Sequence, residues 1–462
     1  MRRSISNLFG ASSRERIARA LAEDGKKSVW PMVDQAIVSL GNFAINIFLA
    51  RYLARLGRLS EYGEFGLLFD LMLFLNGIHA ALVIYPLTLR GAALDRAGVK
   101  RLMSICIGIT IAAMPLVAGI AGVTAALLHH DVRVGAWCGL ALILWQAQET
   151  TRKTLMAELR FRGAIVGDAV SYLGQLACVF TLAKTGHLSL LTTYQCMAVT
   201  SAIAFGLQAW QVGLVPVSLA SAISFARDAW SLGRWVLLSN LSNLFTGTLF
   251  TANFMYWAGK EACGIAAAIN NLLRLANPLL IVVGSVIAPH AVRARARGVR
   301  AAAKVSLRFA ALGAFILTPY LALLIVAPKF AIRFAYGENA VYLSFAYVLI
   351  MIACQNFIGY WAAAASTFLN AVEKSRDAFN GQLTFAITMV VLGMPMTAIF
   401  HYPGAAISGL IAASLQLAVV THAASRLLRS ERSCHARSMQ AVESSSSLFS
   451  TAEQVTGQLN AP

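Results

Sequence analysis

The chain has 462 residues, of which 58% are hydrophobic and only 13% are charged, and its mean hydropathy is +0.67. This composition excludes an ordinary soluble protein. The 38 Lys and Arg outnumber the 20 Asp and Glu, but they are spread over many short segments. We therefore expect them to meet anionic membrane lipids, and we expect no nucleic-acid partner.

About twelve apolar runs are long enough to cross a bilayer. Most Lys and Arg lie in the N-terminal segment, in every second loop and in the C-terminal tail, which the positive-inside rule places in the cytoplasm. The sequence thus predicts an all-α, multi-pass membrane protein with both termini cytoplasmic. The predicted spans are residues 30–50, 64–89, 102–128, 134–157, 164–183, 188–213, 232–258, 262–289, 303–328, 339–369, 378–400 and 403–427.

The spans divide into two groups of six, which we interpret as two six-helix lobes around a central cavity. Aligning Ser39–Phe43 with Asn240–Leu244 also sets Gly63 over Gly264 and Asn76 over Asn277, a pattern typical of duplicated transporters. The predicted parts are a cytoplasmic N-terminal segment (1–29), an N-terminal lobe (30–213), a cytoplasmic connector (214–231), a C-terminal lobe (232–428) and a disordered cytoplasmic tail (429–462).

Polar side chains follow one face of the first span. Gln35, Ser39, Asn42 and Asn46 recur at helical spacing, with Asp34 beside them. Lipid cannot satisfy such groups, so this face must meet protein or a water-filled cavity. The stripe either lines a translocation path, with Asn42 and Asn46 binding substrate, or forms hydrogen bonds between helices.

The seventh span repeats this arrangement. Ser239, Asn243, Thr246 and Asn253 share one face, and Asn243 is its candidate substrate-binding residue. Matching polar faces on equivalent spans of two lobes favour a shared cavity.

Arg274 is a basic residue placed well inside a predicted span, with Asn270 and Asn277 on the same helical face. A guanidinium forms bidentate bonds to phosphate oxygens, so these three residues are candidates for binding a phosphorylated substrate. The alternative is a structural ion pair with a carboxylate such as Asp70 or Glu149.

Four sequence segments carry a family resemblance. Ser39–Phe43, Leu49–Leu53 and Glu61–Gly66 resemble the opening of polysaccharide flippases of the multidrug/oligosaccharidyl-lipid/polysaccharide exporter superfamily, and Lys260–Ile265 resembles their junction between the seventh and eighth helices. The resemblance implies translocation of a polyprenyl-pyrophosphate oligosaccharide across the bacterial inner membrane for surface or exopolysaccharide synthesis, with other polysaccharide assembly proteins as partners.

The resemblance also implies a role for Asp34, because related drug exporters place a cation-coupling Asp on the first helix. Asp34 is therefore the candidate ion-coupling residue. The alternative is an interfacial carboxylate in water, paired with Lys26 or Lys27.

Two other classes of function stay open. The loop Gly91–Arg101 resembles a major-facilitator motif at Gly91, Asp95, Arg96, Gly98 and Lys100, which would indicate a secondary transporter of a small solute. The other is a membrane polymerase or ligase acting on lipid-linked sugars, which would need a catalytic loop on the outer face, where the predicted loops are short and carry few catalytic side chains. We expect a protein that is not an enzyme and has no cofactor. His129–Asp131 is interpreted as an exposed turn, so no metal site is expected.

Overall fold

The structure is a computed structural model of the whole chain. It describes residues 11–459 apart from a few short gaps, and it describes side chains over most of the chain between Trp30 and Glu431. The gaps are residues 92–93, 159, 277–286, 288–289, 293, 296 and 339–340.

The first six predicted spans correspond to the first eight α-helices. Two of these spans contain a short π-helical segment, at Ala80–Ile84 between α2 and α3 and at Ala169–Leu173 between α6 and α7. The helices are α1 (Ala11–Arg55), α2 (Leu59–His79), α3 (Tyr85–Gly91), α4 (Arg96–His129), α5 (Val132–Ala157), α6 (Phe161–Asp168), α7 (Gly174–Lys184) and α8 (Leu190–Val212).

The remaining spans correspond to the later helices, which have breaks at particular residues. Gly259 has a φ of 87° inside α10 and His401 has a φ of 52° inside α16. The backbone is not helical at these two residues, so each of them divides its segment into two helices. The helices are α9 (Leu219–Thr246), α10 (Thr248–Arg274), α12 (Val299–Val326), α13 (Pro328–Tyr336), α14 (Ala346–Ala371), α15 (Ser375–Thr388) and α16 (Met394–Leu459).

The predicted fold class is confirmed. Within the described residues the regular structure is helical throughout, and eight helical segments are long and apolar enough to cross a membrane. The helix α5 is not among these eight, and its second half carries Glu149, Arg152 and Lys153. The predicted eleventh and twelfth spans lie together in one long helical stretch, Ser375–Glu431.

The helices group into two compact units. The first comprises Met1–Pro278, Leu323–Ala353 and Met389–Ser408, and the second comprises Leu279–Ala322, Cys354–Thr388 and Gly409–Pro462. These borders differ from a division at the 214–231 connector, because α9 and α10 pack on helices of the first six spans. The division into two six-helix lobes stays a prediction.

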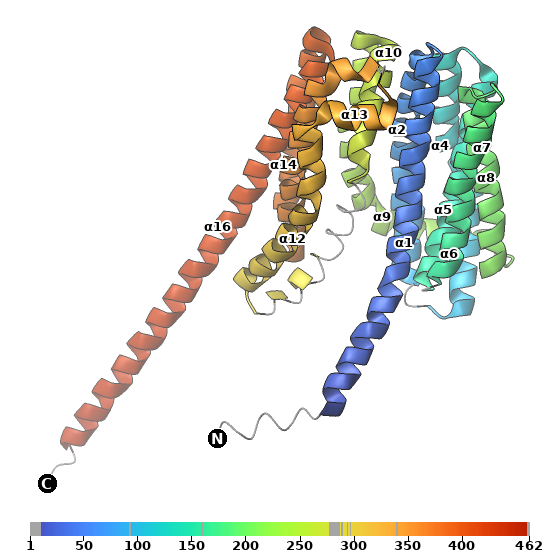
Figure 1. Ribbon diagram of the computed structural model, residues 1–462. Coiled ribbons are helices and arrows are strands. Elements are labelled where there is room, and N and C mark those ends of the chain that lie inside the picture. The colour runs from blue at the N-terminus through green and yellow to red at the C-terminus, as the bar shows by residue number, and fades with distance from the viewer. Residues whose placement is uncertain are drawn as a thin grey trace. The chain divides into compact units, whose positions relative to one another are not determined.

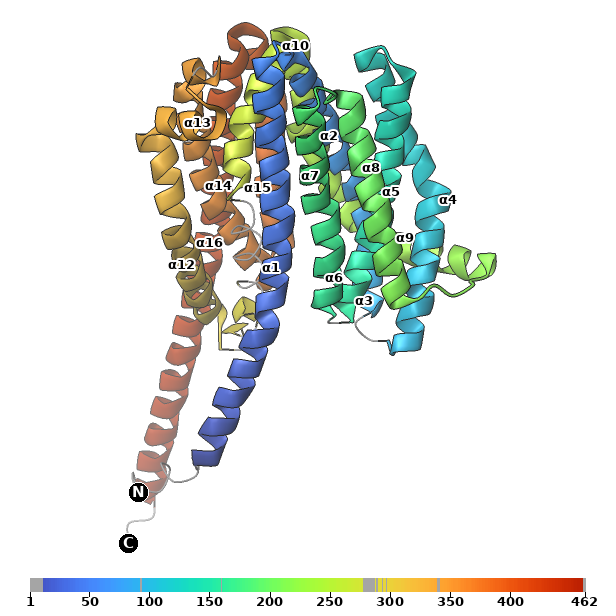
Figure 2. The same ribbon diagram turned by 45° about the vertical axis from the view of Figure 1, so that its right-hand side comes forward.

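Small residues allow the closest helix contacts in the first unit. Both views show α4, α5 and α8 side by side (Figures 1 and 2). Gly122 and Gly135 bring α4 and α5 together, and a Cβ at Gly122 would lie 2.9 Å from the carbonyl oxygen of Gly135. Gly63 and Gly264 do the same for α2 and α10, since a Cβ at Gly264 would lie 3.2 Å from the backbone nitrogen of Gly63. The two glycines that the sequence alignment pairs thus touch each other.

Two elements were not predicted from the sequence. The short helix α13 lies between the ninth and tenth predicted spans, and its Phe330 and Phe334 are exposed. The helix α16 continues to Leu459, through the tail for which the sequence predicts disorder.

Candidate functional site

A buried ionic cluster joins three helices of the first unit. Arg152 on α5 contacts Asp34 on α1 through Nη2 at 2.6 Å and Glu149 through Nη1 at 3.0 Å. Its Nε lies 2.6 Å from Oδ2 of Asp168 on α6, without the alignment of a hydrogen bond. The side chains of Asp34 and Asp168 are 1% and 0% exposed. These two carboxylates are therefore almost completely removed from solvent.

The cluster contains more negative than positive charge. Three carboxylates, those of Asp34, Glu149 and Asp168, face two cations, Arg152 and Lys153, the latter 3.5 Å from Glu149. When all five groups are ionised, one negative charge is left over. The Oδ1 atom of Asp34 is buried without a hydrogen-bond partner in the described part of the chain. A proton or a small cation bound there would offset the surplus charge.

The backbone next to Asp168 is irregular. The π-helical segment Ala169–Leu173 begins directly after this residue, and such segments are frequent at functional sites. Within the segment, Ser171 donates to Oε1 of Gln148 at 2.9 Å. Gln148 in turn donates to Oδ1 of Asp168 at 3.4 Å, so two side chains of α5, Gln148 and Arg152, contact the carboxylate on α6.

A second ion pair joins α10 to α2. Arg274 lies at the end of α10 and its Nη2 is 2.8 Å from Oδ1 of Asp70. The other carboxylate oxygen of Asp70 accepts from Thr251 at 3.1 Å, and the guanidinium lies 5.5 Å from the ring centre of Phe69. The two charged side chains are 31% and 25% exposed. This pair corresponds to the structural alternative for Arg274, but it is open enough for another anion to reach the guanidinium.

A third charged group lies at the ends of α2, α4 and the second half of α10. Glu64 is 2.6 Å from Lys260 and 2.6 Å from His129, and Lys260 also donates to the carbonyl oxygen of Leu128 at 2.8 Å. His129 is therefore tied to a carboxylate. Asp131 accepts from the backbone nitrogen of Arg133 at 2.8 Å and caps α5.

The first-span stripe is partly satisfied within its own helix. Gln35 donates to Ser39 at 3.2 Å, and the buried Asn46 donates to the carbonyl oxygen of Asn42 at 2.9 Å. The structure buries Asp34 against Arg152, on another helix, and both lie within the first unit.

The other predicted site residues have different surroundings. Asn270 is exposed on α10, whereas its buried neighbour Asn271 donates to the carbonyl oxygen of Phe43 at 3.3 Å. Asn243 belongs to α9, but its side chain lies outside the described set, and Asn277 lies outside the described residues.

Sequence reasoning did not select Arg152, Asp168 or Asn271. The charges at 34, 152 and 168 are far apart in the chain, and only the tertiary structure joins them. The available signal was the presence of opposite charges inside apolar runs, which must be paired if they are buried.

No protein-family model and no curated protein sequence matches this chain. Solved structures do match it in fold. A multidrug transporter of the MATE family, DinF-BH, has a TM-score of 0.63 at 13% identity, covering 91% of this chain and 97% of its own. A MATE-family multidrug resistance transporter of the MOP superfamily, facing inward, has a TM-score of 0.62 at 12% identity, with 86% and 96% covered.

The lipid II flippase MurJ, in an inward closed conformation, has a TM-score of 0.65 at 12% identity, with 84% of this chain and 87% of that chain covered. At such identities the likeness establishes the fold alone. The chain is a multi-pass membrane protein with the fold of MOP-superfamily transporters. This is the superfamily that the first-span motifs resemble.

Proposed function

We propose that this protein is a flippase, which moves a lipid-linked oligosaccharide across the bacterial inner membrane for surface or exopolysaccharide synthesis. The cargo is a polyprenyl-pyrophosphate saccharide, whose charged headgroup cannot cross the apolar core of a bilayer unaided. The fold shared with the lipid II flippase MurJ supports this proposal, and so do the sequence motifs of the first two spans and the Lys260–Ile265 junction.

The observation that carries the proposal is the half-open ion pair of Arg274 and Asp70. Arg274 lies in the predicted eighth span, where a guanidinium is costly to keep unless it is paired. Arg274 has one carboxylate 2.8 Å away and a side chain that is 31% exposed. A pyrophosphate offers several anionic oxygens with the geometry that a guanidinium binds best, so it competes with the single carboxylate of Asp70.

The remaining site residues have assigned roles in the proposal. The amides of Asn42, Asn46, Asn243, Asn270 and Asn277 bind sugar hydroxyls. Asp34 couples transport to an ion gradient, and the surplus negative charge around Arg152 supports that role.

The test is complementation of a strain that lacks the gene. This strain is expected to accumulate lipid-linked oligosaccharide in its membranes, and the wild-type gene is expected to clear it. Arg274→Ala should lower export about tenfold or more, because a hydrogen bond to a charged group contributes roughly 1.5–3 kcal/mol. Arg274→Lys should retain part of the export activity. The control is Arg133→Ala, which replaces an exposed side chain and should retain all of the export activity.

A double variant separates substrate binding from the ion pair. Arg274→Ala leaves Asp70 unpaired, whereas Arg274→Ala with Asp70→Asn removes both charges. Continued loss of export in the double variant supports phosphate binding, while restored export would reduce Arg274 to a structural role. If the deletion strain accumulates no lipid-linked saccharide and instead becomes sensitive to cationic dyes, the protein is a drug exporter and the proposal is wrong.

A further inference from the structure

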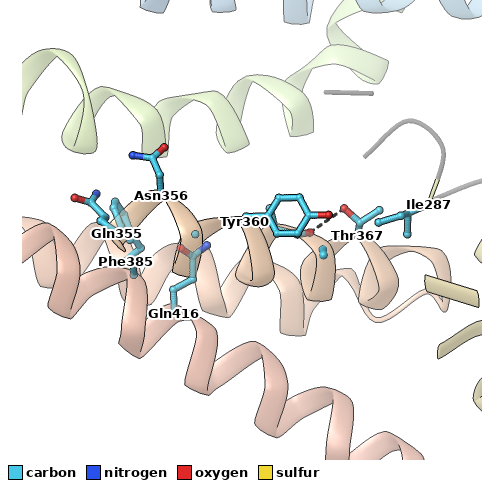
Figure 3. A pocket seen from close by; sticks show the side chains of 11 residues that line it. Ile287, Gln355, Asn356, Tyr360, Thr367, Phe385 and Gln416 are labelled. Atoms are coloured by element: carbon cyan, nitrogen blue, oxygen red, sulfur yellow. Dashed lines mark hydrogen bonds between the residues drawn. The ribbon is translucent and has the colours of Figure 1, made fainter. Parts of the chain in front are cut away.

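The second unit contains a cavity of about 260 Å³ with a polar, uncharged wall. Figure 3 shows Gln355, Tyr360 and Thr367 spaced along α14, with Gln416 reaching toward them from α16. Phe385 of α15 adds an aromatic ring to the lining. All these residues belong to the second unit, so the cavity is separate from the ionic cluster around Arg152.

Two glycines give the cavity its space. A Cβ added at Gly359 would meet no atom within 4 Å, so this lining residue faces open volume. A Cβ at Gly409 would lie 2.5 Å from Oε1 of Gln355. Any larger residue at position 409 would therefore push the Gln355 amide out of its present position. Gly359 thus leaves the cavity open, and Gly409 leaves room for the amide of Gln355.

The amides at the wall have hydrogen-bonding capacity to spare. Neither Gln355 nor Gln416 forms a side-chain hydrogen bond within the described residues. Each can donate two hydrogen bonds and accept others. Thr367 already donates to the carbonyl oxygen of Ala363 at 2.9 Å, and Tyr360 donates to that of Ala310 at 2.5 Å. Their oxygens remain able to accept.

The chemistry of this wall selects a kind of ligand. None of the described lining residues is charged, so nothing there matches a phosphate or a carboxylate. Side-chain amides complement a ligand whose hydroxyls both donate and accept, and an aromatic face packs against its carbon-bound hydrogens. The volume lies below the roughly 300–1,000 Å³ of pockets for drug-sized ligands, so it suits one ring rather than a chain of rings.

We infer that this cavity is a binding site for a single neutral sugar ring of the cargo. The inference rests on the proposed function for the identity of the cargo. It adds that the saccharide contains an uncharged residue, and that Gln355 and Gln416 recognise its hydroxyls.

Saturation-transfer NMR on the full-length protein in phosphatidylcholine nanodiscs tests the inference. Nanodiscs are needed because glycoside detergents would present their own sugar headgroups. The probes are methyl N-acetylglucosaminide, which is neutral, and methyl glucuronide, which is anionic. We expect saturation transfer to the neutral probe at least about fivefold stronger than to the anionic one.

Two variants locate the binding. Gly359→Leu should fill the cavity without a clash and reduce the neutral signal about fivefold or more. Gln416→Met, which keeps the length of the side chain and removes the amide, should weaken it as well. The matched control is Gly206→Leu, a leucine at an exposed position of α8 with equally open surroundings, which should leave the signal unchanged.

The outcomes separate this inference from the proposed function. No transfer in the wild type, equal transfer to both probes, or an unchanged signal in Gly359→Leu would overturn the sugar site, even if the deletion strain accumulates lipid-linked saccharide. Binding that Gly359→Leu abolishes, in a protein whose deletion causes no such accumulation, would support the site and refute the flippase.

Discussion

Arg152 is the residue on which the ionic contact between α1, α5 and α6 depends. Its side chain is 7% exposed and contacts carboxylates from all three helices. Transferring a guanidinium from water costs several kcal/mol, and the nearby carboxylates offset this cost only while the contacts remain intact. The arginine and its partners therefore stabilise one another, and the loss of either side leaves a buried charge.

Replacing Arg152 should show this dependence directly. Arg152→Gln leaves Asp34 and Asp168 buried without their counter-charge, and we expect a loss of about 3–5 kcal/mol of stability. Thermal unfolding in nanodiscs measures the loss. Adding Asp34→Asn and Asp168→Asn should restore much of it, because no uncompensated charge then remains. The control is Arg133→Gln, whose side chain is 78% exposed and whose ion pair contributes little. Equal effects of the two single replacements would contradict this account.

Individual residues also show which features of the site could be predicted from the sequence and which could not. Asp34 and Arg274 could be selected because charges are rare inside apolar runs, and both lie in ion pairs. Their partners could not be assigned, since an Arg that meets Asp70 or Glu149 gives the same pattern in the sequence. The exposed Asn270 and the buried Asn271 differ by one position, and a small change in helix rotation decides which of them is buried.

Among the helices, α2 and α10 make a close contact at two glycines that the alignment of the two halves already pairs. Gly63 and Gly264 lie at the crossing, so the two backbones meet without intervening side chains. Backbones at this separation gain dispersion contacts along the helices, which is a common basis of association in lipid. The same approach brings Lys260 within 2.6 Å of Glu64.

A methyl group at this crossing should be poorly tolerated. In Gly63→Ala the added Cβ would lie 2.9 Å from the backbone nitrogen of Gly264 and closer still to the carbonyl oxygen of Lys260. Overpacking of this kind typically costs about 1–3 kcal/mol. The control is Gly119→Ala on α4, where the Cβ would meet nothing within 4 Å. The melting temperatures of the purified variants give the comparison, and a Gly63→Ala protein as stable as the control would show that the crossing can relax.

For the molecule as a whole, the distribution of Lys and Arg predicts orientation as well as fold. The structure contains helices at the predicted spans wherever those residues are described. We expect the loops that carry most basic residues on the cytoplasmic side, because such loops resist translocation. The orientation of both termini stays a prediction.

Reporter fusions test this orientation. Alkaline phosphatase is active only outside the cytoplasm, whereas green fluorescent protein fluoresces when it folds inside the cytoplasm. A phosphatase inserted at Gly186, between α7 and α8, should be active, and one placed after Gly213 should not. A fluorescent protein fused after Pro462 should fluoresce. Reversed results at all three positions would mean that the chain is inserted the other way round.

More of the fold than of the candidate site could be predicted from the sequence. Hydropathy and charge were sufficient for a helical multi-pass protein, because spans in lipid must satisfy their own backbones. They did not reveal the breaks at Gly247, Gly259 and His401, which depend on local backbone angles. They also could not place α9 and α10 against the first six spans, since packing partners leave no periodicity in a single sequence.

The surplus charge around Arg152 sets the work that membrane voltage can add to the proposed cycle through ion coupling. If Asp34 takes up one monovalent ion per cycle, one elementary charge moves with it, and a membrane voltage of 100 mV then supplies about 2.3 kcal/mol. Since each 1.36 kcal/mol corresponds to a factor of ten, that energy sustains a cargo ratio of roughly fifty between the two leaflets. A steeper accumulation in a living cell would draw on a further driving force, such as the concentration gradient of the ion, the charge of the pyrophosphate itself or rapid consumption of the cargo after it emerges.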